Sequence, residues 1–383
     1  MRTLVAIAGL SLIFIVLWDA FETVVLPRRV TRKFRLARYF YRATWRPWAR
    51  IAGRLRNEKR REAYLSYFGP LSLLLLLSTW ALGLVVSFAL LHRAARGPVQ
   101  AIDEVPGFGG DLYFSGTTFF TLGIGDVLPQ TPLDRAVTVA EAGVGLGFLA
   151  IVIGYLPVIY QAFSRREVNI SLLDARAGSP PTAAGLLRRH SQDHGLEALQ
   201  QLLHEWEHWS AELMESHLSY PVLAYFRSQH NNQSWLGALT AILDTSALVM
   251  AGVKGACKRQ AELTFAIARH AVVDLAQVFG SPPTSAANDR LPSGELLRLR
   301  MYLEDAGLRL PEGIAVDEKL TELRRMYEPY VQSLSRHLRI ELPPWITEHR
   351  RADNWQTSAW EKTAGRSGNE STELKVSADD EHY

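Results

Sequence analysis

Six consecutive residues, Thr121–Asp126, read Thr-Leu-Gly-Ile-Gly-Asp and have the types and spacing to bind a bare cation. Glycine adopts left-handed backbone dihedrals without a Cβ clash, and here it recurs at every second position. Alternating left-handed residues turn successive carbonyls of an extended strand toward one side. A ring of such carbonyls can replace the water around a dehydrated cation. The strip therefore predicts a cation filter, with ion-binding positions at Thr121, Leu122, Gly123, Ile124, Gly125 and Asp126.

Membrane-spanning helices must hold such a filter, and the sequence contains three apolar runs of sufficient length. A bilayer span takes roughly 20 apolar residues, which the runs Leu4–Leu26, Leu71–Leu91 and Ala136–Phe163 provide. The first run could also be a signal peptide, but no small-x-small cleavage site follows it, which favours an uncleaved helix. The segment Asp111–Phe120 precedes the strip and has the length of a re-entrant half helix.

The net charge of +3 conceals a strongly basic segment between the first two runs. Residues Arg28 to Glu62 include 14 Lys or Arg and two acids, and no comparable excess occurs elsewhere. By the positive-inside rule this segment faces the cytoplasm, so the N-terminus and the loop 93–134 lie outside. The region from Arg165 onward is then cytoplasmic. The single cysteine, Cys257, is consistent with a reducing compartment, and the charge balance does not indicate nucleic-acid binding.

The basic segment also has a helical pattern of its own. Arginines between Arg28 and Arg54 recur at mostly helical spacing, with aromatic residues interleaved. This pattern predicts a helix in the lipid headgroup region, kinked at Pro47, that could bind anionic lipid. The segment could serve only as a topology signal, or it could form a lipid-sensitive gate. A voltage sensor is disfavoured, because the segment is too polar to span the bilayer.

Three carboxylates lie in the predicted spans, where an ionised group needs a partner. Asp19 and Glu22 share one face near the inner end of the first span. We expect them to form ion pairs with the arginine pair that follows this span or with another basic segment, rather than a proton or cation site. Glu141 has two alternatives. It could line a cavity and concentrate cations, or it could bond behind the half helix to Thr117 or Thr118.

The region around the strip resembles the pore loop of potassium channels. The resemblance covers roughly residues 68–166. The whole chain is similar to a bacterial single-pore-loop channel with an extra N-terminal helix. The resemblance rests on Tyr113, Phe114, Ser115, Thr118 and the strip, and it continues without a gap through Pro129, Thr131 and Arg135. It implies a homotetramer that conducts K⁺ and needs no cofactor. The implied ligands are the carbonyls of Thr121, Leu122, Gly123 and Ile124 and the Thr121 hydroxyl.

The sequence departs from the usual filter at one position. Ile124 stands where Tyr or Phe is common, and isoleucine cannot hydrogen-bond to the pore helix. A non-selective cation channel is therefore the alternative function.

The third span carries the features of a gate. The resemblance places a hinge at Gly145, with Gly143 beside it, although Gly143 and Gly147 could equally serve close helix packing. Pro157 removes a backbone hydrogen bond and predicts a kink further along the helix. Residues one and two turns beyond the hinge would line the cavity; they are Leu146, Leu149 and Ile153.

The C-terminal region reads as mostly helical. Apolar residues recur at three- and four-residue spacing in Leu196–Leu218, Trp235–Val253, Arg259–Phe279, Gly294–Ala306 and Asp317–Ile340. The second of these is apolar enough to resemble a fourth span, but Asp244 at its centre favours a buried helix outside the membrane.

One motif in this region suggests a different chemistry. His204-Glu205-x-x-His208 matches the spacing of a zinc peptidase helix. A membrane-anchored zinc hydrolase is thus a further alternative, beside a structural metal site and solvent-facing histidines.

Together these patterns predict an all-α membrane protein with three transmembrane helices, a re-entrant pore helix and filter, and an all-α cytoplasmic domain. The expected division is 1–26 for the N-terminal helix, 27–66 for the basic segment, 67–166 for the pore domain, 167–350 for the helical domain and 351–383 for a disordered tail. The expected function is a tetrameric potassium channel of the inner membrane, rather than an enzyme.

Overall fold

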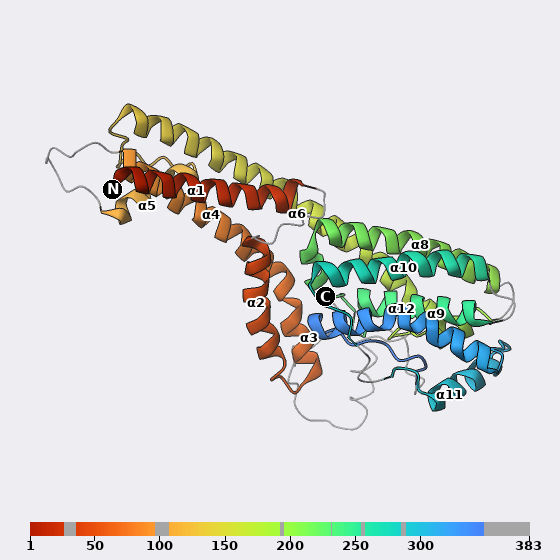
Figure 1. Ribbon diagram of the computed structural model, residues 1–383. Helices are drawn as coiled ribbons and strands as arrows, with labels where there is room; N and C mark the ends of the chain where they lie inside the picture. The colour runs from red at the N-terminus through yellow and green to blue at the C-terminus, as the bar shows by residue number, and fades with distance from the viewer. Residues whose placement is uncertain are drawn as a thin grey trace, which may run out of the picture. The chain divides into compact units, whose positions relative to one another are not determined.

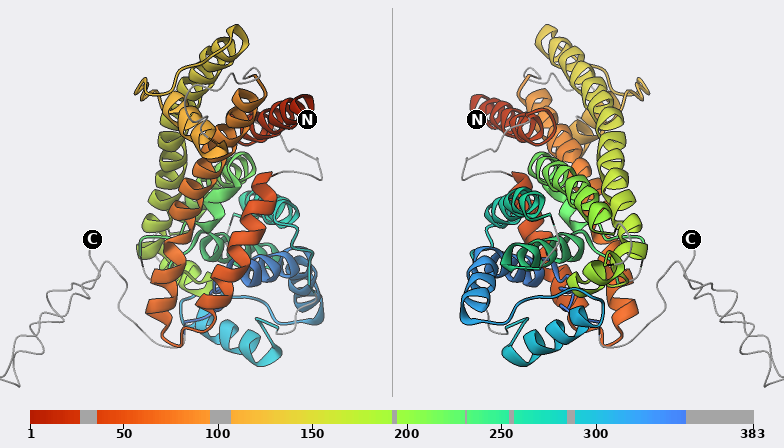
Figure 2. Two further views of the ribbon diagram at one scale, coloured as in Figure 1. Left: turned by 90° about the vertical axis from the view of Figure 1, so that its left-hand side faces the viewer. Right: turned by 90° about the vertical axis from the view of Figure 1, so that its right-hand side faces the viewer.

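The chain folds into two compact units of helices. The computed structural model describes residues 1–26, 36–95, 107–191, 195–230, 232–253, 257–284 and 289–347, and all regular elements within these ranges are helical (Figures 1 and 2). The first unit, here called the membrane unit, comprises Met1–Phe163 and Ser216–Arg227. The second, the C-terminal unit, comprises Ser164–Glu215 and Ser228–Tyr383. The predicted tail, 351–383, lies outside the described residues.

Three helical stretches of the described chain are long and apolar enough to cross a bilayer, as predicted. They are Arg2–Val25, Glu58–Ala95 and Pro132–Ala177. The first is α1 (Arg2–Ala20) continued by a π-helical segment (Phe21–Val25), the second contains α4 (Phe68–Ala95), and the third is α6. The prediction of an all-α membrane protein is confirmed.

The predicted third span is only part of α6, which continues 14 residues beyond Phe163 to Ala177. Pro157 lies inside this helix without ending it. The segment predicted as a re-entrant half helix forms α5 (Phe108–Phe119), which lies between α4 and α6 in Figure 2.

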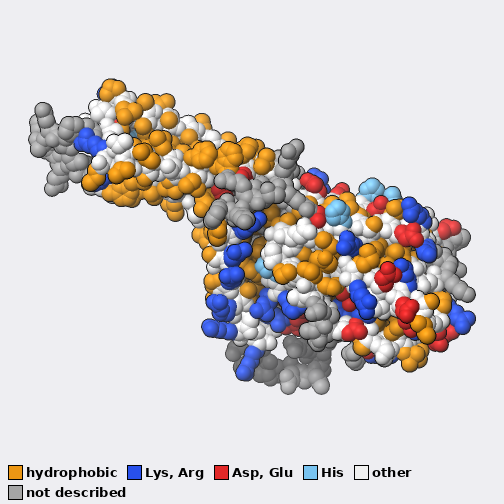
Figure 3. Space-filling view, viewed as in Figure 1, with side chains coloured by type: hydrophobic (Ala, Val, Ile, Leu, Met, Phe, Trp, Pro, Cys, Tyr) orange, Lys and Arg blue, Asp and Glu red, His pale blue; other side chains and the backbone are white. Residues whose placement is uncertain are grey.

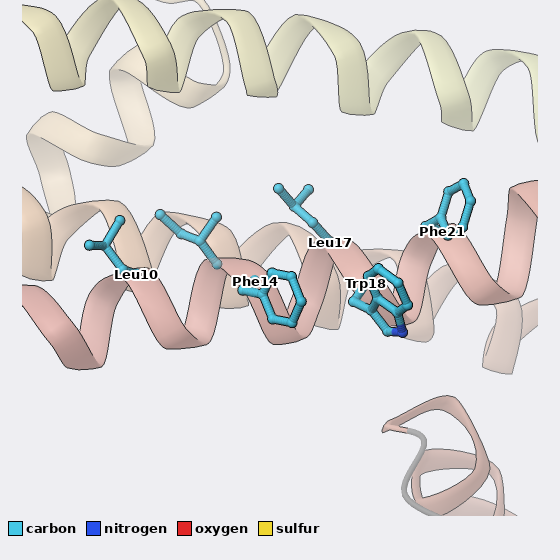
Figure 4. A pocket seen from close by; sticks show the side chains of 6 residues that line it. Leu10, Phe14, Leu17, Trp18 and Phe21 are labelled. Carbon is cyan, nitrogen blue, oxygen red and sulfur yellow. The ribbon is translucent and has the colours of Figure 1, made fainter. Parts of the chain in front are cut away.

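Small residues allow α1 to lie close against α4. A Cβ on Gly9 would come within 2.9 Å of the Ser87 carbonyl oxygen, and one on Gly83 within 3.2 Å of Val16. Helices in a membrane associate through such close backbone approach. Another face of α1 is exposed and apolar. Figure 4 shows the side chains that line a hollow along it, namely Leu10, Ile13, Phe14, Leu17, Trp18 and Phe21.

The basic segment forms α2 (Leu36–Ala52) and α3 (Glu58–Ser66), and α2 continues through Pro47. The buried carboxylate of Asp19 accepts hydrogen bonds from the Ala37 amide at 3.1 Å and from the Trp80 indole at 3.0 Å. Asp19 thus binds the N-terminus of α2, where a negative charge is favourable, and joins α1 to α2 and α4. Glu22 accepts from the Trp18 indole at 2.7 Å. The arginine pair expected beside these acids, Arg28 and Arg29, lies outside the described residues.

The C-terminal unit is built around one buried helix. Its elements are the end of α6 from Ser164, α7 (Ala183–Arg189), α8 (Gly195–Ser219) as far as Glu215, α9 (Trp235–Ala251), α10 (Lys258–Val278), α11 (Ser293–Glu304) and α12 (Ile314–Leu338). Nearly every side chain of α9 is buried, and α9 packs against α10 and α12. This confirms the prediction of a buried helix for the second apolar segment of the region.

Buried charges within this unit are paired. The carboxylate of Asp244, at the centre of α9, accepts from Arg290 at 2.6 Å and from the Tyr327 hydroxyl at 2.5 Å. Nearby, burial raises the pKa of Glu328, although Arg324 at 3.0 Å opposes this shift. An unpaired charge at such depth would cost several kcal/mol, so these contacts account for an aspartate within an apolar helix.

Candidate ion-conduction site

The strip Thr121–Asp126 follows directly from the end of α5. The φ angles of Thr121, Gly123 and Gly125 are +57°, +55° and +83°, so left-handed residues alternate along it. For the two glycines this conformation matches the sequence-based prediction. For Thr121 it is a strained conformation that a residue with a Cβ seldom adopts, and such strain often accompanies function.

Hydrogen bonds attach the first half of the strip to α5. The amide of Thr121 donates to the Thr118 carbonyl at 3.0 Å, and the amide of Leu122 donates to the Thr117 carbonyl at 2.8 Å. The amide of Gly123 also donates to Thr117, at 3.3 Å. Within the described part of the chain, the carbonyls from Thr121 to Gly125 accept no hydrogen bond. The first three amides of the strip are therefore bonded to α5, while the carbonyls from Thr121 to Gly125 stay available as acceptors.

A side-chain bond holds the far end of the strip. The Tyr113 hydroxyl, on α5, donates to the Asp126 carboxylate at 2.9 Å, and the other carboxylate oxygen accepts from the Val127 amide at 3.0 Å. No pattern in the sequence indicates this pair. It provides a bond from α5 to the strip, which Ile124 cannot make.

Four polar side chains meet behind the pore helix and form what we call the polar cluster: His92 of α4, Ser115 of α5, and Asp134 and Glu141 of α6. All four are fully buried. His92 contacts Asp134 through Nδ1 at 2.6 Å and Glu141 through Nε2 at 2.8 Å. The Ser115 hydroxyl donates to Glu141. The cluster thus links three helices of the membrane unit.

The cluster corrects one of the two interpretations of Glu141. Its carboxylate does not line a cavity, because it is fully buried and bonded to His92 and Ser115. It lies behind the pore helix, but its partners are not Thr117 and Thr118. The Thr117 hydroxyl instead donates to the Phe114 carbonyl within α5. A carboxylate in this apolar setting is retained only where donors surround it.

The four glycines of α6 have different surroundings. A Cβ on Gly145 would lie 2.1 Å from the Phe119 carbonyl oxygen, so this glycine allows α6 to touch the end of α5. A Cβ on Gly143, Gly147 or Gly154 would meet nothing within 4 Å. The structure therefore gives Gly145 a packing role, and its role as a hinge stays a prediction. The expected packing through Gly143 and Gly147 does not occur within a single subunit.

The predicted cavity residues of α6 share an exposed face. Leu146, Leu149 and Ile153 have exposed fractions of 62%, 52% and 64%. Pro157, one turn beyond Ile153, is exposed as well. Their apolar side chains are available to face an axis, a neighbouring subunit or lipid.

The zinc motif lacks a complete ligand set. His204 and His208 lie on the exposed surface of α8 with ring centroids 4.8 Å apart. Glu205 contacts Arg176 at 3.5 Å. No group of three metal-ligating side chains occurs in the ranges that the structure describes. A catalytic zinc normally has three protein ligands, so this arrangement does not support the hydrolase alternative.

Comparison with known proteins agrees with the geometry of the membrane unit. A family model described as "Ion channel" matches residues 74–161, which include α5, the strip and much of α4 and α6. The chain is also similar to the uncharacterized membrane protein YdjJ of Bacillus subtilis (strain 168), with 24% identity over 187 residues. That alignment covers 48% of this chain and 54% of YdjJ, so the chain spans about half the length of this relative. No solved structure matches the chain. Residues 74–161 of this chain are thus similar to an ion channel domain.

Proposed function

We propose that four copies of this chain assemble into a potassium-selective channel whose filter is Thr121–Asp126. The observation that carries the proposal is that the amides and the carbonyls of the strip differ in their hydrogen bonding. The amides of Thr121, Leu122 and Gly123 donate to carbonyls of α5, whereas the carbonyls of Thr121 to Gly125 accept no hydrogen bond within the described residues. Unbonded carbonyls on a strand with alternating left-handed residues are suited to replace the hydration shell of an ion.

The exposure of the site supports assembly of several copies around one axis. Every residue of the strip is exposed in one subunit, and irregular backbone at membrane depth is tolerated only where protein or water surrounds it. Four strips around one axis would satisfy this condition. The exposed face of α6 with Leu146, Leu149 and Ile153 would then line the cavity below the filter. Gating would involve the inner helix near Gly145, Gly143 and Pro157.

The same proposal includes an orientation in the inner membrane. The basic segment between α1 and α4 would lie in the cytoplasm, and the filter would open to the outside. The C-terminal unit would then be cytoplasmic.

Current through purified protein in planar bilayers would test the filter. With asymmetric KCl and NaCl, the reversal potential should shift toward the potassium equilibrium potential, and Gly123→Ala should abolish the current. Glu205→Gln is the matched control. It removes the essential base of the hydrolase alternative, and the channel should keep its full current. A wild-type current with no shift toward the potassium potential would contradict selectivity.

A non-selective cation channel is the second candidate, and Ile124 is the observation that favours it. Its side chain is 61% exposed and cannot hydrogen-bond to α5. Under this alternative the wild type would discriminate poorly between K⁺ and Na⁺. Ile124→Tyr would then increase the permeability ratio for K⁺ over Na⁺ measured in the same bilayers.

Anionic lipid is the proposed partner of α2. Arg38, Arg42, Arg46 and Arg50 recur every four residues and are all exposed, and Figure 3 shows a column of basic side chains on this helix. One stripe of guanidinium groups beside a membrane-spanning unit suits lipid phosphates. Replacing Arg42 and Arg46 with Gln should lower the channel's activity in phosphatidylglycerol bilayers toward its activity in phosphatidylcholine. An unchanged ratio between the two lipids would contradict this assignment.

A further inference from the structure

A short segment from the C-terminal half of the chain is buried in the membrane unit. We call Tyr220–Arg227 the wedge; it contains a 3₁₀ helix, Pro221–Tyr225. Five consecutive side chains, from Val222 to Phe226, are at most 6% exposed. The wedge belongs to the membrane unit, although the flanking stretches, Ser164–Glu215 and Ser228 onward, belong to the C-terminal unit. An irregular segment with five buried residues in a row must fit a complementary surface.

One side of the wedge contacts α6. The rings of Tyr220 and Tyr155 have centroids 5.8 Å apart, and those of Phe226 and Phe163 are 5.6 Å apart. Ile159 is fully buried in the same cluster. Because Tyr155, Ile159 and Phe163 are spaced by four residues, they form one face of α6. This face differs from the exposed one that carries Leu146, Leu149 and Ile153.

The other side of the wedge contacts α2 and α4. The Tyr225 ring stacks on Tyr41 of α2 with centroids 5.8 Å apart and an interplanar angle of 7°, and it lies 4.9 Å from the Trp45 ring. Phe226 occupies the space beside Gly69 of α4, where a Cβ would come within 2.7 Å of the ring. These contacts brace the wedge against α2 and α4.

An ion pair ends the wedge. Arg227 lies 3.6 Å from Glu62 of α3, and the arginine side chain is only 10% exposed. The wedge is therefore held by ring packing along its length and by charge at its end.

We propose that the wedge positions the inner helix, so that the C-terminal unit acts on the gate through Tyr220 and Phe226. The inference rests on the proposed channel function for its consequence, namely control of opening. Its structural basis is independent of that function: the wedge contacts α6 on both sides of Pro157, and both of its ends continue into the C-terminal unit. Movement of that unit would be transmitted to the inner helix by direct packing.

Single-channel recording in planar bilayers tests the role in gating. Phe226→Ala and Tyr220→Ala should each change the ratio of open to closed time at least threefold, while unitary current and reversal potential stay unchanged. Adding Tyr155→Ala to Tyr220→Ala should have little further effect, because the two rings act as a pair. The control is Phe265→Ala, which truncates a buried ring of α10 and should change the ratio less than twofold.

A charge reversal provides a second test that leaves the apolar core intact. Glu62→Arg and Arg227→Glu should each alter the ratio of open to closed time, and the double variant should restore the wild-type value. Wild-type ratios in all of the wedge variants, or an equal effect of Phe265→Ala, would overturn the proposal.

Thiol labelling separates the wedge from the channel function. In a Cys257→Ser background, Tyr160→Cys places a thiol on the exposed face of α6, and Leu4→Cys places one on α1. Phe226→Ala should change the maleimide labelling rate at position 160 at least threefold and leave the rate at position 4 unchanged. This result in a protein that passes no current would defeat the channel function but support the wedge. Unchanged labelling at both positions would overturn the wedge itself.

Discussion

At the scale of single residues, the membrane unit contains buried acids whose hydrogen-bond partners lie far away along the chain. His92 contacts Asp134 and Glu141, which are 42 and 49 residues away, and Ser115 contacts Glu141 across 26 residues. The sequence identifies Glu141 as a carboxylate that requires a partner. It does not identify the partner, because helix periodicity determines which face a residue occupies but not which helix covers that face.

Removing the Glu141 side chain should destabilise the membrane unit strongly. In Glu141→Ala, His92 keeps its contact with Asp134 but loses the one with Glu141. The buried Ser115 hydroxyl also loses Glu141 and keeps only the Val85 carbonyl as an acceptor. Removing one partner from a buried charged group typically costs about 3 to 5 kcal/mol. Thermal unfolding in detergent micelles would measure this loss. Val139→Ala, on an exposed part of the same helix, is the control, and equal stability of the two variants would contradict the role of the cluster.

In the strip, by contrast, the local residue types are sufficient to predict the backbone conformation. Glycine at alternate positions predicts the left-handed conformation, and both Gly123 and Gly125 have positive φ. The bond between Tyr113 and Asp126 was not predicted, because it requires the path of the chain between α5 and the strip.

At the scale of elements, periodicity locates helices well when they are long. The five helices predicted in the C-terminal region agree with α8 to α12 within three residues at each end. The seven-residue α7 was missed, because so short a helix contains too few turns to show a pattern. The helix predicted from the arginines between Arg28 and Arg54 corresponds to α2, and a second helix, α3, begins beyond it after the N-cap residue Asn57.

The contact between α5 and α6 should depend on one glycine. In Gly145→Ala the new Cβ would overlap the Phe119 carbonyl oxygen, so the helices would have to separate. Overpacking of this kind costs about 1 to 3 kcal/mol. Gly143→Ala is the matched control, since a Cβ there meets nothing and alanine favours the helix by up to about 1 kcal/mol. Unfolding temperatures in detergent would distinguish them, and the same temperature for both variants would contradict the contact.

At the scale of the whole molecule, the order of the chain differs from the order of its compact units. The sequence suggests consecutive domains with a boundary at residue 166, and the first part of the membrane unit ends nearby at Phe163. The return of Ser216–Arg227 to this unit was not predicted. Pro221 and the apolar residues after it resemble an ordinary interhelical turn, and only the positions of Tyr155, Ile159 and Gly69 show what they contact.

This return limits how the chain can be divided into modules. A chain cut after residue 166 would keep the apolar spans and the strip, and it would retain the whole segment that matches the ion channel family. It would lack the side chains that cover Leu73, Tyr155 and Ile159, and it would leave an apolar notch on α4 and α6. Residues 1–166 are therefore not a complete structural unit. Grafting the membrane unit onto a different C-terminal domain would require Ser216–Arg227, or a replacement of the same shape, to be transferred with it.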